Sequence, residues 1–216
     1  MIKAILFDLD GTLLDTNELI YKSFFHMFKE VLDIELPKTE ITRLYGKPLE
    51  RSLEKYANNR EELERMINEY RSYNADHHDE MCAPFEGVME LLQTLNSKGI
   101  KLGIVTSKRK AVAERGMMLG GILEYMDVII SPESTTKHKP DGEPVLKACE
   151  NLGVSPSEAL MVGDSPYDIL AGKNAGAKTC GVKYTALPLE KLGESEPDFY
   201  VDKPLEILDL VEKLNS

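Results

Sequence analysis

The segment Asp8-Leu9-Asp10-Gly11-Thr12 carries two carboxylates two positions apart, directly after a short apolar run. In an extended strand, residues two apart point to the same side, so Asp8 and Asp10 should share a face as the chain leaves the sheet. Two like charges held close together require a cation or a proton between them. Taken alone, the segment is also compatible with an acidic turn hinged at Gly11.

Hydroxyl and ammonium groups follow two later apolar runs. Thr106 and Ser107 come after the second run, and Lys139 lies in Lys137-His138-Lys139-Pro140 after the third. Hydroxyl residues commonly begin helices, and a lone lysine usually belongs to a solvated loop. Each group therefore has an ordinary structural explanation when it is considered separately.

The segment Gly163-Asp164-Ser165-Pro166-Tyr167-Asp168 follows the fourth apolar run and holds two more carboxylates. A helix that begins at Pro166, capped by Asp164 or Ser165, would explain it. However, open α/β sheets bind their ligands beyond the carboxyl ends of their strands. Four such segments in a row favour a site for phosphate and a cation.

Short apolar runs carry these groups, and they alternate along the chain with longer segments of helical periodicity. This alternation predicts an α/β fold with a Rossmann-like parallel sheet. The expected strands are almost entirely apolar, as strands covered on both faces must be. They are Ala4–Phe7, Leu102–Thr106, Val128–Ile130, Leu160–Val162, Thr179–Val182 and Phe199–Val201.

An insertion separates the first two expected strands, since residues 8–101 are far more than one crossover helix needs. The pattern from 18 to 81 is helical, with a break at Gly46-Lys47-Pro48, and another helix is expected over 88–97. We therefore expect a core of residues 1–15 and 83–216 that carries the groups described above. Residues 16–82 should form an inserted α-helical cap that opens and closes over the site.

The composition excludes several classes of partner. Aspartate and glutamate outnumber lysine and arginine 37 to 26, so the acidic surface would repel nucleic acid. No apolar run is long enough for a signal peptide or a membrane span, and the three cysteines show no disulfide or zinc spacing. We expect a cytoplasmic protein without membrane or nucleic-acid partners. Its oligomeric state does not follow from the sequence.

In their order along the chain, Asp8 to Thr12, Thr106, Lys139 and Gly163 to Asp168 resemble the four motifs of the haloacid dehalogenase-like (HAD) phosphatases. The resemblance covers the whole chain, and the pair DxDGT and GDxxxD is highly specific. One departure is Gly142, where many relatives have a second proline after Lys-Pro-x. The resemblance implies a Mg²⁺-dependent phosphohydrolase that forms an aspartyl phosphate.

The resemblance also implies roles for the four carboxylates. Asp8 would be the nucleophile and a metal ligand. Asp10 would act as general acid and base, and would offer only its backbone carbonyl to the metal. Asp164 would bind the metal directly, whereas Asp168 would hold a metal-bound water.

Three further core residues would bind the transferred phosphoryl group by the same resemblance. Thr106 would hold a phosphoryl oxygen through its hydroxyl, with help from backbone amides and from Ser107. Lys139 would neutralise the charges of phosphate and carboxylate together. Phosphoryl transfer depends mainly on such positioning and charge stabilisation.

The expected cap determines the substrate, and its segments Asp15–Leu19 and Glu69–Glu80 resemble those of HAD-type inorganic pyrophosphatases. Phosphoglycolate phosphatases and other small phosphomonoester phosphatases share the arrangement and remain the alternative. A beta-phosphoglucomutase also shares the motifs. The cap residues able to contact an anionic substrate are Arg43, Lys47, Arg51, Arg71, His77 and His78.

Two other classes of function were weighed against an enzyme. A phosphoacceptor signalling domain uses a similar set of groups, but it carries its aspartate after an internal strand and needs no large helical insertion. A catalytically silent binding module would not need all four motifs intact. Neither a Ser-His-Asp arrangement nor a P-loop is present.

Overall fold

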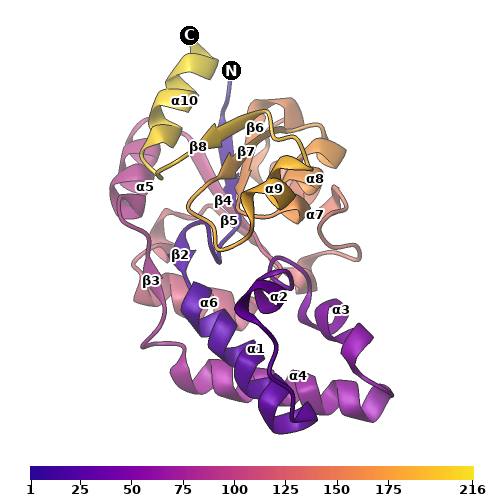
Figure 1. Cartoon of the computed structure of the whole chain (residues 1–216). Helices are drawn as coiled ribbons and strands as arrows, with labels where there is room; N and C mark the ends of the chain where they lie inside the picture. Colours follow the sequence, from indigo (N-terminus) through magenta and orange to yellow (C-terminus); the bar gives the residue numbers. More distant parts are fainter.

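A six-stranded parallel sheet forms the centre of the computed structural model, which describes all residues 1–216 (Figure 1). The spatial order of its strands is β5-β4-β1-β6-β7-β8. Their bounds are β1 Ala4–Phe7, β4 Lys101–Val105, β5 Val128–Ile130, β6 Ala159–Gly163, β7 Lys178–Val182 and β8 Phe199–Val201. The predicted α/β fold is confirmed, and the strand ends differ from the sequence-based expectation by one residue at most.

Helices cover both faces of the sheet. Along β1, Ile5 and Phe7 face one layer and Ala4 and Leu6 the other, since successive strand residues point to opposite sides. The first layer consists of α5 (Val88–Ser97), α6 (Lys110–Leu119) and α10 (Glu206–Asn215). The second consists of α7 (Glu143–Leu152) and α8 (Pro166–Ala175). Coverage on both sides explains why the strands read as unbroken apolar runs.

The residues between β2 and β3 are helical and lie below the sheet in Figure 1. They form α1 (Asn17–Leu32), α2 (Lys38–Thr42), α3 (Leu49–Leu53), a 3₁₀ turn (Glu54–Tyr56) and α4 (Arg60–His77). We call Asn17–His77 the cap segment. It has a hydrophobic cluster of its own, in which α1 packs against α4 and the rings of Phe24 and Tyr70 lie 4.7 Å apart.

A two-stranded antiparallel ribbon joins the cap segment to the sheet. It pairs β2 (Leu14–Asp15) with β3 (Ala83–Pro84), so the chain enters and leaves the cap segment at adjacent points. This ribbon was not expected from the sequence, because two-residue strands have no periodicity to detect.

The remaining elements are short. They are α9 (Leu189–Gly193) and the 3₁₀ turns Leu123–Tyr125, Pro132–Ser134 and Pro156–Glu158. No helix of the chain combines the length and the apolar character that crossing a membrane requires.

Candidate active site

The carboxyl ends of three neighbouring strands meet at the centre of the sheet, because β4 and β6 flank β1. Asp8 follows β1, Thr106 follows β4 and Asp164 follows β6. Open α/β sheets bind ligands at such a point, where the strand order reverses. The structure thus brings together the core residues that the sequence singled out.

Lys139 lies at the centre of a buried cluster of carboxylates, and its side chain is only 3% exposed. Its Nζ donates hydrogen bonds to Asp8 Oδ1 at 2.8 Å, to Asp168 Oδ1 at 2.5 Å and to the carbonyl of Val105 at 2.9 Å. All three ammonium hydrogens therefore have acceptors. A buried charge without such partners would be strongly destabilising.

Burial and mutual repulsion shift the pKa values of these groups. Burial raises the pKa of Asp8 to about 7, although the neighbouring Lys139 acts in the opposite direction. Burial, followed by repulsion from Asp168 and Asp8, also raises the pKa of Asp164 well above its ordinary value. Burial alone would lower the pKa of Lys139, but Asp168 and Asp8 raise it above its usual range. The cluster holds more negative charge than one lysine balances.

This excess charge fits a divalent cation. Carboxylate oxygens of Asp8, Asp164 and Asp168 all lie within 4.8 Å of one another, and each residue is buried. Asp8 Oδ2 and Asp164 Oδ1 accept no hydrogen bond, whereas both oxygens of Asp168 are engaged, by Lys139 and by Ser165. Hard oxygen donors of this kind suit Mg²⁺. The arrangement favours Asp8 and Asp164 as the side-chain ligands.

Gly11 allows Asp164 to approach the loop that carries Asp8. Its φ is +80°, and a Cβ at this position would lie 2.4 Å from Asp164 Oδ2. Any other residue would clash with the carboxylate and would also strain the backbone. The glycine of the first motif therefore has a definite task, which is to admit the carboxylate of the fourth.

Asp10 is held by two groups at the edge of the site. Its Oδ1 accepts hydrogen bonds from Thr16 Oγ1 at 2.7 Å and from Lys108 Nζ at 2.8 Å. Thr16 precedes the first helix of the cap segment, and Lys108 lies in the loop after β4. The Asp10 carboxylate is thus positioned by one group at the start of the cap segment and by one group from the loop after β4.

The loop after β4 carries more of the site than the sequence analysis predicted. Thr106 is buried, and its Oγ1 accepts a hydrogen bond from the backbone N–H of Lys108 at 3.1 Å. Lys108 and Arg109 were not singled out, although both line the pocket next to Asp8. The available signal was the run Lys108-Arg109-Lys110 directly after the hydroxyl pair.

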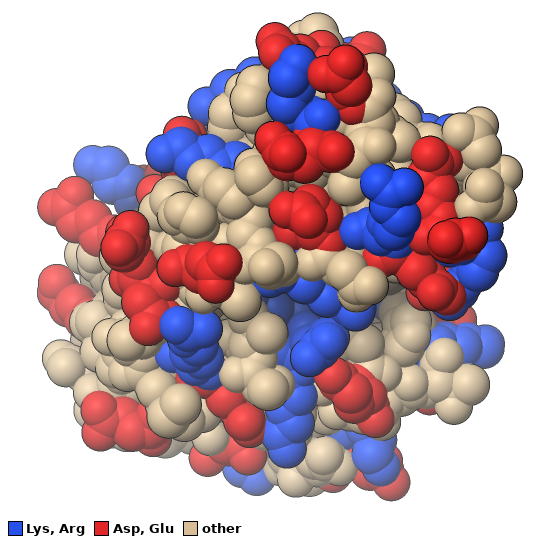
Figure 2. Space-filling view, turned by 90° about the horizontal axis from the view of Figure 1, so that it is seen from below, with Lys and Arg blue, Asp and Glu red and all other residues tan.

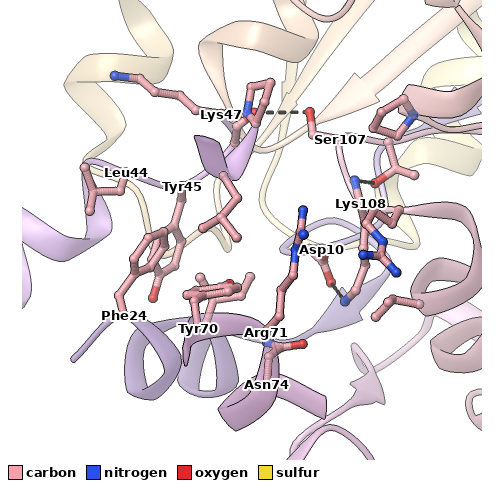
Figure 3. A pocket seen from close by; sticks show the side chains of 18 of the residues that line it. Asp10, Phe24, Leu44, Tyr45, Lys47, Tyr70, Arg71, Asn74, Ser107 and Lys108 are labelled. Atoms are coloured by element: carbon pink, nitrogen blue, oxygen red, sulfur yellow. Dashed lines mark hydrogen bonds and ion pairs between the residues drawn. The ribbon is translucent and has the colours of Figure 1, made fainter. Parts of the chain in front are cut away.

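A pocket of about 440 Å³ separates the sheet edge from the cap segment, and 26 residues line it. Figure 3 shows Arg71 rising from α4 between an aromatic group (Phe24, Tyr45 and Tyr70) and the bonded pair Asp10 and Lys108. The basic residues that line the pocket are Lys47, Arg71, Lys108, Arg109, Arg115 and Lys139.

Two of these cations lie close together without a carboxylate partner. Arg71 comes from the cap segment and Arg109 from the loop after β4, and neither forms an ion pair. Partial burial, followed by repulsion from Arg109, lowers the pKa of Arg71, while the Glu50 carboxylate acts in the opposite direction. Guanidinium groups that repel one another across a pocket are suited to an anion that lies between them.

The turn Gly46-Lys47-Pro48 reaches the core. Ser107 Oγ donates a hydrogen bond to the carbonyl of Gly46 at 3.4 Å, and a Cβ on Gly46 would lie 2.7 Å from Ser165 Cβ. Lys47 lines the pocket, but its ammonium lies 5.9 Å from the ring centre of Tyr167. The predicted phosphate residue Ser107 is thus engaged by the cap segment.

Of the other cap residues named from the sequence, some line the pocket and others do not. Arg43, Arg51 and His77 do not line the pocket, and the His77 ring stacks on Tyr73 with ring centres 4.1 Å apart. His78 does line it, fully buried, with Nδ1 3.1 Å from Asp79 Oδ1 and no partner for Nε2. Burial lowers the pKa of His78, although the hydrogen bond to Asp79 acts in the opposite direction.

Thr185 is a further site residue that the sequence analysis missed. Its Oγ1 donates a hydrogen bond to Asp164 Oδ2 at 2.8 Å. It lies after β7, in a segment without a motif, and no pattern in the sequence distinguishes it from other loop threonines.

The charge on the cap side of the molecule is unevenly distributed. Seen from that side, Lys and Arg side chains gather in the hollow centre of the surface, while Asp and Glu are numerous around it (Figure 2). This contrasts with the formal net charge of −11 for the whole chain. A local excess of cations in a hollow attracts small anions even when the whole protein is acidic.

Comparisons with known proteins agree with this geometry. The sequence profile of the family described as "Haloacid dehalogenase-like hydrolase" matches residues 5–182. A Clostridium perfringens protein that bears the name PpaX is 71% identical over 216 residues, which is 100% of both chains. Pyrophosphatase PpaX of Bacillus velezensis is 40% identical over 209 residues, covering 97% of this chain and 96% of its own.

Solved structures show the same relationship in three dimensions. A haloacid dehalogenase-like family hydrolase from Streptococcus pneumoniae superposes with a TM-score of 0.85 at 28% identity, covering 97% of this chain and 98% of its own. Family profile, full-length relatives and fold all agree with the motif order of the sequence. The chain therefore belongs to the haloacid dehalogenase-like hydrolases and is an enzyme, a phosphohydrolase.

Proposed function

We propose that this enzyme is a Mg²⁺-dependent inorganic pyrophosphatase that works through an aspartyl phosphate on Asp8. The observation that carries the proposal is the pair of cations Arg71 and Arg109, which form no ion pair and repel each other in the same pocket as the Asp8 cluster. Pyrophosphate has an anionic leaving half, which needs cations of its own. The PpaX name of relatives that match the whole chain supports this substrate.

In the first half-reaction, a carboxylate oxygen of Asp8 bonds to phosphorus while the bond from phosphorus to the leaving oxygen breaks. Asp10 gives a proton to that oxygen. In the second, a water oxygen attacks phosphorus, Asp10 takes the proton of the water, and the carboxylate of Asp8 is restored. Asp8 and Asp10 line the same pocket, as this sequence of steps requires.

Asp8 and Asp164 would hold Mg²⁺, with the backbone carbonyl of Asp10 as a further ligand. The bound ion would neutralise negative charge on the phosphoryl oxygens and on the nucleophile. Asp168 then has a different main task from the one expected, because its two oxygens hold Lys139 and Ser165. Asp168 would also contact a metal-bound water.

Phosphate binding falls to the groups around Thr106. Its hydroxyl, fixed by the N–H of Lys108, would contact a phosphoryl oxygen, and Lys139 would balance the charge. Ser107 would contribute once its weak bond to Gly46 is given up. Preorganised donors of this kind stabilise the charge that develops during transfer.

Lys108 would serve the leaving phosphate. In this structure its ammonium is bound to Asp10 Oδ1, and its side chain is only 11% exposed. When Asp10 turns toward the leaving oxygen, Lys108 is released beside the same oxygen. A cation freed at that moment would pair with the departing phosphate, a role that a neutral leaving group would not need.

The proposal also assigns a role to the inserted helices. Residues 16–82 would act as a cap that closes over a small phosphorylated substrate, joined to residues 1–15 and 83–216 through the ribbon β2–β3.

The three cysteines are free, and burial raises the pKa of each thiol, the least shifted being Cys82 and Cys149 at about 11. Such unreactive thiols suit the reducing cytosol.

A substrate panel tests the proposal. Phosphate release would be measured from pyrophosphate, phosphoglycolate, sugar phosphates and an aryl phosphate, each with and without Mg²⁺. We expect the highest kcat/KM for pyrophosphate and no turnover without the metal. A wild-type enzyme that prefers phosphoglycolate would overturn the assignment of pyrophosphate as substrate. Turnover without any divalent ion would overturn the proposed dependence on Mg²⁺.

A further inference from the structure

The loop between β7 and α9 contacts three separate parts of the molecule. Tyr184 OH donates a hydrogen bond to the carbonyl of Thr12 at 3.0 Å, beside the nucleophile loop. Thr185 Oγ1 donates to Asp164 Oδ2 at 2.8 Å. Leu187 lies two residues further and points away from the sheet, into the cap segment. We call residues Tyr184–Pro188 the coupling loop.

Leu187 is the one member of the cap's buried hydrophobic cluster that comes from outside the cap segment. It is 7% exposed and belongs to the same cluster as Phe24, Leu44 and Tyr45, while Ala186 packs against the edge of that cluster. Removing apolar surface from water favours this contact only while the cap segment rests on the core. The position of Leu187 therefore depends on the position of the cap.

Thr185 links Leu187 to the proposed metal ligand through a single oxygen atom. Its Oγ1 accepts a hydrogen bond from the backbone N–H of Leu187 at 3.0 Å and donates its own hydrogen to Asp164. A threonine side chain is stiff because it is branched at Cβ. A shift of Leu187 thus moves the N–H donor that orients the Thr185 hydroxyl, and through this hydroxyl the Asp164 carboxylate.

We propose that the coupling loop makes Mg²⁺ binding depend on the seating of the cap, with Thr185 as the positioning residue. With the cap seated, Thr185 holds Asp164 Oδ2 and leaves Oδ1 directed to the metal. With the cap lifted, Leu187 is withdrawn and this restraint on Asp164 is lost. The inference rests on the metal site of the proposed function but not on the choice of pyrophosphate as substrate.

The first arm of the test changes the hydroxyl of Thr185. Binding of Mn²⁺, used as a probe for Mg²⁺, would be measured on the full chain by electron paramagnetic resonance, without substrate. Thr185→Val keeps the shape and should raise the Kd roughly 10-fold or more, as loss of a group that orients a metal ligand does. Thr185→Ser restores the hydroxyl and should bind nearly as the wild type, as should Thr39→Val, a solvent-exposed cap threonine outside the pocket.

The second arm changes the cap contact and leaves every ligand intact. Leu187→Ala should raise the Mn²⁺ Kd by about 3-fold, within the range for packing residues that couple two sites. Leu189→Ala is the matched control, since Leu189 is 49% exposed and lies two residues away. Leu187→Met keeps the apolar contact and should restore the affinity. Thermal unfolding of each variant shows whether it is folded.

The proposal is overturned if Thr185→Val binds Mn²⁺ as the wild type does, or if folded Leu187→Ala cannot be distinguished from Leu189→Ala. Failure of the proposed function gives a different pattern. In that case the Mn²⁺ affinities respond as expected, while the wild-type enzyme ranks pyrophosphate below another phosphate.

Discussion

Charged groups are arranged in opposite ways on the two sides of the pocket. On the core side, Asp8, Lys139 and Asp168 are buried and bonded to one another before any substrate arrives. On the cap side, Arg71 and Lys47 have no carboxylate partner. Buried charges must be paired to be tolerated, whereas accessible ones can wait for a ligand. Under the proposed function, the core would perform the phosphoryl transfer and the cap would select the group attached to the transferred phosphate.

Replacement of Asp8, the proposed nucleophile, should have the largest effect on turnover. Asp8→Asn should lower turnover of every substrate by about 10⁴ to 10⁶, as removal of a nucleophile does in other enzymes. The amide is nearly isosteric, so circular dichroism should show an intact fold. A variant that keeps a tenth of the wild-type activity would exclude Asp8 as the nucleophile.

The next largest effect should come from Lys139. Lys139→Ala should lower kcat by roughly 10² to 10³ for all substrates, the cost of losing one preorganised charge-stabilising donor. Lys137 is the matched control, because it is exposed and pairs only with Asp141. Equal losses in Lys137→Ala and Lys139→Ala would mean that the buried cluster has no special role.

The buried carboxylates should make metal binding depend on pH. Burial raises the pKa of Asp8 to about 7, and the cation requires the deprotonated carboxylate. Affinity for Mg²⁺ should therefore be fully present above that pKa and should fall as the pH drops below it, by up to about 10-fold per pH unit for one proton. Titrations between pH 5.5 and 8 check this. A flat profile would contradict it, and Asp8→Asn should reduce the slope.

The cap side should show a smaller effect that depends on the substrate. Arg71→Met should lower kcat/KM for pyrophosphate by about 10-fold, the value of one hydrogen bond to a charged group, and should leave an aryl phosphate almost unchanged. Lys47→Ala should act in the same direction but more weakly, because its ammonium lies over Tyr167. Arg65→Met, on the same helix but outside the pocket, is the control. Equal losses on both substrates would remove the selective role of the cap.

Much of the core could be predicted because its groups follow strands that are nearly all apolar. Asp8, Thr106 and Asp164 each come directly after such a strand, and the sheet order brings their ends together. The six strands were expected from their apolar runs, and the helical insertion from its length and its helical periodicity. The pairing of Lys139 with Asp168 was not expected, because Asp168 was assigned only to a metal-bound water.

The remaining contacts could not be predicted, because no sequence pattern marks the residues that make them. Lys108 and Thr185 carry no motif, and their roles appear only from the atoms that they touch, Asp10 and Asp164. Periodicity also cannot say which face of a cap helix meets the pocket. For this reason the sequence named Arg43 and His77 together with Arg71, although only Arg71 lines the pocket.

The most direct measurement of the central claim is the decay of the phosphorylated enzyme. Rapid chemical quench followed by mass spectrometry should find one phosphoryl group on the peptide that carries Asp8, and none in Asp8→Asn. The phosphorylated enzyme formed from pyrophosphate should lose its phosphate at the same rate as that formed from an aryl phosphate, because the leaving group has already departed. Absence of phosphorylated Asp8 during turnover, or decay rates that depend on the substrate, would contradict the account.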